Sequence, residues 1–293
     1  MDYQQFVVVV KDNISLMLSE NTKLEIQTTL KNNGKERVGI TFTDQQINIS
    51  PTIYLEEYYA QFQKGNSLDA ITENILGVYR EVKFEHSWQI NTIQDFDCIR
   101  SKIVYKLIHA KKNETLLTTM PHLFYLDFAI TFYVLFEVDK NGTATIPITH
   151  ELVHLWQTNV HELHQLARKN TKQLLPATFL PIRVVIEELM GKPCNTEVFE
   201  DDIMFVLTNS LRSFGAVCIL YESILEQIAG QLGENFYILP SSIHEVIIVP
   251  ESQSPGREIL DEMIVEMNQT QLETEEVLSD HAYYYDNDRQ CLD

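Results

Sequence analysis

The hydrophobic pattern of the N-terminal third alternates between helix-like and strand-like periods. Apolar side chains at helical spacing, among them Phe6, Val10 and Ile14, predict an amphipathic helix within the first twenty residues. Two strand-like runs follow, and Asn32-Asn33-Gly34 between them is typical of a tight hairpin because Asn and Gly tolerate a positive φ. Ser50-Pro51 then has the form of an N-cap followed by a first-turn proline. The expected elements are strands over 23–30 and 37–42 and helices over 54–62 and 67–83.

The rest of the chain is richer in strand-like runs, and several of them arrive in pairs. Asp139-Lys140-Asn141-Gly142 separates two such runs and indicates a hairpin. Asn159, followed three residues later by Glu162, is typical of a capping box at a helix start. We therefore expect strands over 99–108, 124–138, 143–149, 203–208, 236–239 and 245–249, and helices over 159–169, 181–190, 221–232 and 254–267.

The order of these elements predicts the fold class. Strands that arrive in hairpins, rather than singly between helices, favour an α+β fold with antiparallel sheets built from hairpins and helices packed on one face. No long stretch rich in Pro, Gly or Ser divides the sequence. We therefore expect a single full-length domain over residues 1–293, with residues 1–85 as a candidate N-terminal lobe.

The charge balance disfavours nucleic acid and anionic membranes as partners. Lys and Arg number 22 against 42 Asp and Glu, which gives a formal net charge of -20 and repels phosphate backbones and anionic lipids. Half of this excess lies in residues 251–293, which hold 12 acidic and 2 basic side chains. This segment is either a solvated helical face or a docking surface for a basic protein. Tyr283, Tyr284 and Tyr285 in the same segment either extend that surface or pack against the core.

Cysteine usage and hydropathy indicate a cytoplasmic protein. The four cysteines are far apart, which fits reduced thiols better than disulfides or a zinc ribbon. The apolar run 6–10 follows Asp2 rather than a basic region and is too short for a signal sequence, and no run approaches the length of a membrane span.

Several segments together resemble DUF5688, a family of bacterial domains of unknown function. They are 49–55, Met120-Pro121-His122, 206–209 and, most specifically, the ten residues 238–247 (ILPSSIHEVI). The resemblance implies bacterial cytoplasmic origin and one full-length domain. It implies no activity, cofactor or catalytic residue.

One motif could hold a metal. His150-Glu151-Leu152-Val153-His154 matches HExxH, which on a helix places two imidazoles one turn apart to bind zinc, with the glutamate as general base. However, Thr149 and Asn159 predict only about two turns of helix here, and Val160 stands where a third histidine would be expected. A second helix folding back could bring His161 or His164 near the pair. We regard this zinc site as the less favoured interpretation.

Other polar residues stand beside strongly apolar sequence and form a candidate polar cluster. Ser241, Ser242 and His244 carry groups used in acyl transfer, but a Pro-Ser-Ser break is also explained by local turn hydrogen bonds. Strand alternation would point Ser242 and His244 to one face and Glu245 to the other. His122 with Asp127, and Asn209 after a strand, could likewise be satisfied structural groups or line a cleft. The members of the candidate cluster are His122, Asn209, Ser241, Ser242, His244 and Glu245.

The sequence does not establish a biochemical function. We expect a non-enzymatic protein-binding or regulatory module without a cofactor, whose partner is a basic protein rather than nucleic acid or a membrane. The alternative is a zinc-dependent metallopeptidase or hydrolase that uses His150, Glu151 and His154. Catalytic residues and oligomeric state are not specified by any motif.

Overall fold

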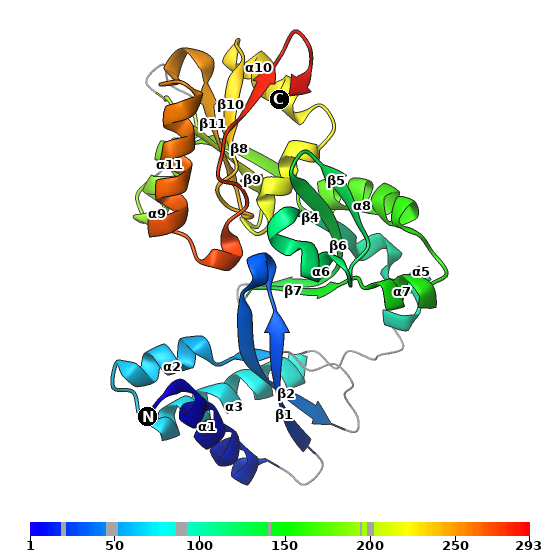
Figure 1. Ribbon diagram of the computed structural model, residues 1–293, viewed down its shortest axis with the longest axis vertical. Coiled ribbons are helices and arrows are strands. Elements are labelled where there is room, and N and C mark those ends of the chain that lie inside the picture. The colour runs from blue at the N-terminus through cyan, green and yellow to red at the C-terminus, as the bar shows by residue number, and fades with distance from the viewer. Residues whose placement is uncertain (19–21, 45–51, 86–92, 140–141, 194, 198–201) are drawn as a thin grey trace. The chain divides into compact units, whose positions relative to one another are not determined.

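The computed structural model describes two compact units, Met1–Cys98 and Ile99–Asp293 (Figure 1). The described residues are 1–18, 22–44, 52–85, 93–139, 142–193, 195–197 and 202–293. Antiparallel strand pairs and packed helices occur in both units, which confirms the predicted α+β class. The candidate lobe 1–85 falls within the first unit, and the single-domain interpretation stays a prediction.

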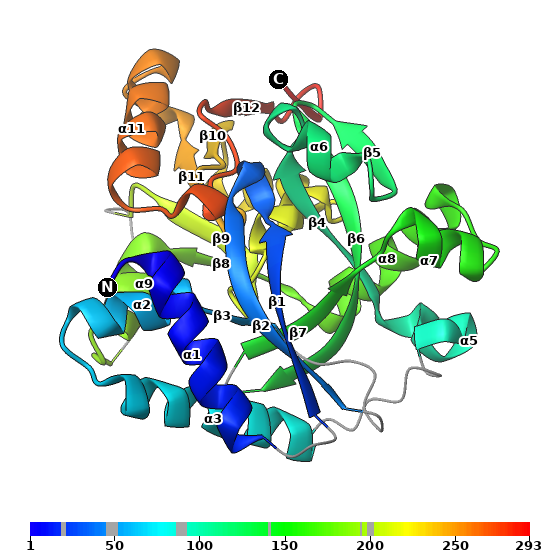
Figure 2. The same cartoon turned by 60° about the horizontal axis from the view of Figure 1, so that its bottom comes forward.

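The first unit is a three-stranded antiparallel sheet with helices on one face. The predicted hairpin is confirmed: Asn33 and Gly34 have φ values of 57° and 72°, and the Lys31 N–H donates to the Lys35 carbonyl at 2.7 Å. Ile40 and Phe42, two residues apart in one strand, are fully buried against Phe6 and other apolar helix residues. The elements, seen together in Figure 2, are α1 (Tyr3–Met17), β1 (Thr22–Leu30), β2 (Glu36–Asp44), β3 (Ile53–Tyr54), α2 (Glu56–Gln63) and α3 (Leu68–Glu85).

The predicted helix over 54–62 begins later than expected. Ile53 and Tyr54 pair with β2, so the helix starts only at Glu56. Ser50-Pro51, on which the helix start was predicted, lies outside the described residues.

The second unit contains a four-stranded sheet in which β6 is central, pairing with β4, β5 and β7. The single strand predicted over 124–138 is wrong: a turn at Leu126-Asp127, with Leu126 at φ 54°, divides it into two paired strands. The strand predicted from residue 99 begins at Ile103, because 96–102 form short helical turns. The hairpin expected at 139–142 is confirmed by the pairing of Asp139 with Gly142. The strands are β4 (Ile103–His109), β5 (His122–Tyr125), β6 (Phe128–Asp139) and β7 (Gly142–Pro147).

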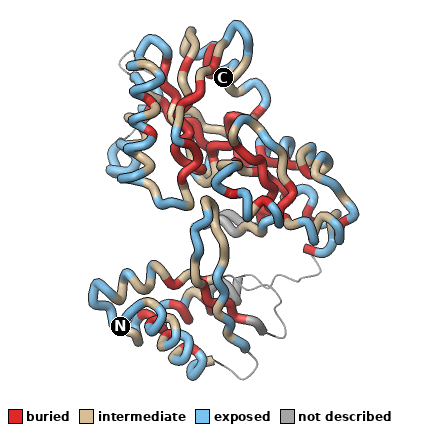
Figure 3. Tube along the Cα trace, viewed as in Figure 1, coloured by how far each residue is buried: buried red, intermediate tan, exposed pale blue. Residues whose placement is uncertain are grey.

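This unit also contains a six-stranded antiparallel sheet, in the order β13-β12-β10-β11-β9-β8. Its central strands are buried along their length, as Figure 3 shows by the buried segments that follow them. The tyrosine-rich segment, whose form the sequence left open, supplies an inner strand. Tyr283 and Tyr285 are buried, so they pack into the sheet rather than extend a recognition surface. The strands are β8 (Ala177–Pro181), which the sequence did not predict, β9 (Phe205–Asn209), β10 (Phe236–Leu239), β11 (Val246–Pro250), β12 (Tyr283–Asp286) and β13 (Cys291–Leu292).

Helices cover parts of the four-stranded and six-stranded sheets of the second unit. Leu260 and Ile264 of α11 pack on Leu239 and Val249 of the six-stranded sheet. None of the described helices is long and apolar enough to cross a membrane. The remaining elements are α5 (Phe96–Ile99), α6 (Glu114–Leu117), α7 (His150–Leu155), α8 (Val160–Leu174), α9 (Ile182–Leu189), the 3₁₀ helix η4 (Gly215–Leu220), α10 (Ile224–Leu232) and α11 (Arg257–Thr270).

The start of α8 follows the predicted cap with one change. The Asn159 side-chain oxygen accepts from the backbone N–H groups of His161 and Glu162 at 3.0 and 3.1 Å. The Glu162 carboxylate accepts from the Thr158 hydroxyl at 2.6 Å, so the return contact of the capping box is made to a side chain.

We expect Asn159→Ala to lower the free energy of unfolding by about 1 kcal/mol, because two backbone donors lose their acceptor. Urea unfolding followed by circular dichroism measures this change. Gln165→Ala, at an exposed position within the same helix, is the matched control and is expected to change stability by less than about 0.5 kcal/mol. Equal effects of the two substitutions would contradict the capping role.

Candidate functional site

The loop between β10 and β11 carries four of the six candidate residues and is held along its length by the segment 276–279. The Ile243 N–H donates to the Glu276 carbonyl, and the Leu278 N–H donates to the Ser241 carbonyl, each at 2.8 Å. Ser241 and Ser242 are buried. Residues 240–245 form a loop rather than a strand. The strand alternation expected for Ser242, His244 and Glu245 therefore does not apply.

Ser242 acts on the backbone. Its hydroxyl oxygen accepts from the His244 N–H at 3.0 Å, the local turn contact expected of serine after a strand. A nucleophilic serine instead needs its hydroxyl against an imidazole nitrogen. The arrangement supports turn formation and offers no support for acyl transfer.

The His244 ring has a hydrogen bond on one nitrogen and a carboxylate near the other. Nδ1 accepts from the Phe214 N–H at 3.3 Å, so the neutral ring carries its proton on Nε2, which lies 3.8 Å from the Glu276 carboxylate. The ring also stacks on Phe214, with centroids 5.5 Å apart. Burial lowers the pKa of His244 below its ordinary value, and the negative charge of Glu276 opposes this shift.

The main chain of His244 joins this loop to the end of β9. Its carbonyl accepts from the Thr208 hydroxyl and from the Gly215 N–H, both at 2.8 Å. Asn209 stabilises the adjacent turn: its Nδ2 donates to the Ser213 carbonyl at 2.8 Å and its Oδ1 accepts from the Leu211 N–H at 3.0 Å. The buried amide is therefore a satisfied structural group, one of the two roles considered from the sequence.

The other two candidates lie apart from these hydrogen bonds. His122, in β5, has its Nδ1 2.9 Å from the Met120 carbonyl and its ring edge-on to Phe124. Glu245 lines a cavity on the face of the six-stranded sheet. Burial and the charge of Glu276 raise the pKa of Glu245, and Arg212 opposes them. The structure thus joins Asn209, Ser242 and His244 and leaves His122 elsewhere.

Lys106 was not identified from the sequence, although it contacts Phe214, the ring that stacks on His244. Its Nζ lies 3.8 Å from the ring centroid of Tyr133 and 4.1 Å from that of Phe214, so the ammonium makes cation–π contacts with both rings. A lone lysine within the strongly apolar run 103–108 was the available signal. Phe214 therefore contacts the lysine as well as the His244 ring.

The HExxH motif forms a short exposed helix. The α7 helix has six residues, begins after Thr149, whose hydroxyl accepts from the Leu152 N–H at 3.4 Å, and leaves His150 and His154 exposed. His164 in the next helix stacks on Tyr105. Within the described part of the chain, no three His, Cys, Asp or Glu side chains are grouped closely enough to hold a metal. The described side chains around His150 and His154 therefore do not fit a zinc centre.

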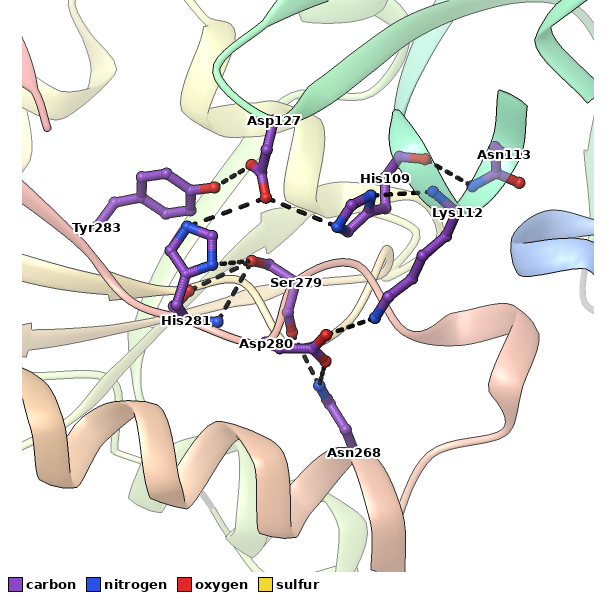
Figure 4. A network of polar contacts seen from close by, with 9 residues as sticks. All are labelled: His109, Lys112, Asn113, Asp127, Asn268, Ser279, Asp280, His281 and Tyr283. Atoms are coloured by element: carbon purple, nitrogen blue, oxygen red, sulfur yellow. Dashed lines mark hydrogen bonds and ion pairs between the residues drawn. The ribbon is translucent and has the colours of Figure 1, made fainter.

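A second polar network, also not predicted, centres on Asp127 (Figure 4). The Tyr283 hydroxyl donates to Asp127 Oδ1, and the Nε2 atoms of His109 and His281 lie 3.8 and 3.9 Å from Oδ2. His109 Nδ1 accepts from the Lys112 N–H at 3.3 Å, which leaves the ring proton on the nitrogen that faces Asp127. Burial lowers the pKa of His109 and, with the hydrogen bond to Asp127, raises that of Tyr283.

An ion pair extends this network to α11. Lys112 Nζ lies 2.6 Å from Asp280 Oδ2, and Asn268 Nδ2 donates to Asp280 Oδ1 at 2.9 Å. Burial raises the pKa of Asp280, but the hydrogen bond and charge of Lys112 lower it by more. The network thus ties the four-stranded sheet to the C-terminal segment of the other sheet, and its polar groups bond to one another.

Comparison with known proteins identifies one family. The model of a family of unknown function, DUF5688, matches residues 3–287. The chain belongs to the DUF5688 family. No curated protein and no solved structure matches it. The resemblance predicted from the sequence is confirmed. Its most specific stretch, 238–247, forms the end of β10, the loop 240–245 and the start of β11.

We expect Gly215→Ala to lower the free energy of unfolding by about 1–3 kcal/mol. A Cβ at Gly215 would meet Thr208 Oγ1 at 2.1 Å, the His244 carbonyl oxygen at 2.5 Å and the Asn209 nitrogen at 2.7 Å. Gly230→Ala is the control, because it lies in α10 with open space and helix propensity favours alanine by up to about 1 kcal/mol. Thermal unfolding should shift in opposite directions; a neutral Gly215→Ala would contradict the close approach.

We expect the stability that depends on His244 to be lost on acidification. Its pKa is lowered in the folded chain, so the unfolded chain binds more protons as the pH falls below about 6.5. The contribution is complete above that pH and declines toward the lowered value. The slope of melting temperature against pH between about 5 and 7 should be shallower in His244→Gln than in wild type. His150→Gln, at an exposed histidine, should keep the wild-type slope; an unchanged slope in His244→Gln would refute the prediction.

Proposed function

We propose that this chain is a non-enzymatic protein-binding module whose outward face of α11 docks a basic protein. The carrying observation is that Glu258, Glu262 and Glu266, spaced four residues apart and therefore on one side of the helix, are all exposed. In the described residues, no Lys or Arg forms a salt bridge with any of the three. The three carboxylates therefore form a row of negative charge that no salt bridge within the described residues neutralises.

Exposed apolar side chains accompany these glutamates. Ile259 and Met263 are 48% and 38% exposed and lie one turn apart beside the acidic row. A partner that presents Lys or Arg next to apolar residues would match both features, with the charges favouring association and the apolar contacts adding buried area. Nucleic acid has the wrong charge for this surface.

The inner side of α11 is fixed, which favours docking on a preformed helix. Leu260 and Ile264 are fully buried. The Asp261 carboxylate accepts from the Ala282 N–H at 2.6 Å, and Asn268 Nδ2 donates to the Ser279 carbonyl at 2.8 Å. Because the helix is already ordered, binding on its outer side costs little conformational entropy.

The polar clusters supply no argument for an enzyme. The Ser242 hydroxyl and the Asn209 amide bond to the backbone, and Asp127 accepts from the Tyr283 hydroxyl with two histidine rings nearby. These contacts support a structural role for each group. Bacterial origin and a cytoplasmic location, inferred from the resemblance and the cysteine usage, belong to the same proposal, as does a regulatory role.

Neutralising the α11 row should abolish capture of the partner. We expect affinity purification from the native host to recover a basic protein at about 50 mM salt and much less at about 500 mM, because salt screens exposed charges. The triple variant Glu258→Gln, Glu262→Gln, Glu266→Gln should no longer capture the basic partner at either salt concentration. Quantitative mass spectrometry of the captured proteins measures this loss.

The control removes the same number of charges elsewhere. Glu114, Glu151 and Glu226 are exposed, and their triple change to Gln should leave capture at the wild-type level. Equal capture by both triple variants, or a partner insensitive to salt, would refute α11 as the docking surface.

A further inference from the structure

A cavity of about 310 Å³ lies on one face of the six-stranded sheet, between strands and α9. Its floor is a row of side chains on adjacent strands: Val206 of β9 pairs directly with Leu180 of β8 and Ile247 of β11, so all three lie on the same face. Val185 and Leu189, one turn apart on α9, form a wall. The volume and the apolar lining are those of a small-molecule site.

The same sheet face is covered by α11 only in part. Ile247 contributes to the cavity floor and also packs with the apolar cluster under Leu260 and Ile264. The cavity therefore begins beside the region that α11 covers, and α9 and α11 lie on the same face of this sheet (Figure 1). None of the three α11 glutamates lines it, so the cavity is a feature separate from the docking surface.

The charged residues that line the cavity are Arg212 and Glu245, and only Arg212 has an ion-pair partner among the described residues. Arg212 forms an ion pair with Glu188. Glu245 makes no side-chain hydrogen bond or ion pair with any residue that the structure describes, although it is half-buried among apolar side chains. A carboxylate withdrawn from water gains from a charged donor.

We propose that this cavity binds a small apolar molecule that carries one primary ammonium group, with the ammonium on Glu245 and the hydrocarbon on the Val206, Ile247 and Val185 side chains. Arg212, Glu188 and Glu245 together leave one negative charge at the site, and the chain has a net charge of -20, so a cation is favoured over an anion. A carboxylate ligand would have to compete with Glu188 for Arg212.

The test compares three probes with the same six-carbon chain: n-hexylamine, 1-hexanol and hexanoate, each titrated into the full chain at neutral pH and followed by ligand-observed NMR. We expect hexylamine to bind at least about tenfold more tightly than hexanol, the ratio given by one charged hydrogen bond, and hexanoate to bind least. Binding of hexylamine no tighter than that of hexanol, or no binding of hexylamine, would overturn the proposal.

Two variants separate the charge from the apolar contacts. Glu245→Gln should reduce hexylamine affinity to that of hexanol and leave hexanol unchanged, and Val185→Trp, which fills the cavity, should abolish binding of both. Glu151→Gln, at an exposed acid on α7, should behave as wild type. Circular dichroism and melting temperature establish that each variant is folded. A folded Glu245→Gln that keeps the preference for the amine would refute the assignment of Glu245.

Discussion

The carbonyl oxygen of His244 is the acceptor on which the arrangement of the second unit's polar loops depends. It accepts from the Thr208 hydroxyl and from the Gly215 N–H, and thereby joins the end of β9, the start of η4 and the β10–β11 loop. This approach is possible only because Gly215 has no side chain to separate the two backbones. Two consequences follow from chain connectivity: Phe214, just before the glycine, stacks on the His244 ring, and Glu245, just after the histidine, reaches the cavity.

The Asp127 network provides a second connection within this unit and shows the same physical principle. A carboxylate at the β5–β6 turn is surrounded by Tyr283, His109 and His281, which come from distant parts of the chain. Partly buried polar groups are costly unless they are paired, and here each supplies the partner of another. The network therefore favours one relative position of the four-stranded sheet and the C-terminal segment, and it accounts for polar residues within apolar sequence without invoking catalysis.

The two proposed binding features use the same sheet for different purposes. The sheet supports α11 through Leu260 and Ile264, which leaves the acidic side of that helix free to meet a basic surface. Beside α11 the same sheet face forms the apolar floor against which α9 encloses the cavity. In both places negative charge stands next to apolar side chains, on a chain with nearly twice as many acidic as basic residues. In both proposals this combination favours an amphipathic cation, presented by a protein in one case and by a small molecule in the other.

The sequence by itself determined the family, the α+β class and several local turns and caps. The Asn33-Gly34 turn, the Asn159 cap and the end of the helix predicted over 221–232, which Gly233 follows, were predictable because each depends on conformational preferences within a few residues. The local turn hydrogen bond of Ser242 was likewise one of the two alternatives that the sequence offered. Only the tertiary structure decided that the run 124–138 turns back at Asp127, whose hydrogen-bond donor Tyr283 is 156 residues away. It alone decided that Glu245 faces a cavity. Such partners depend on which strands pair and in which register, and these long-range contacts leave no periodic signal in the sequence.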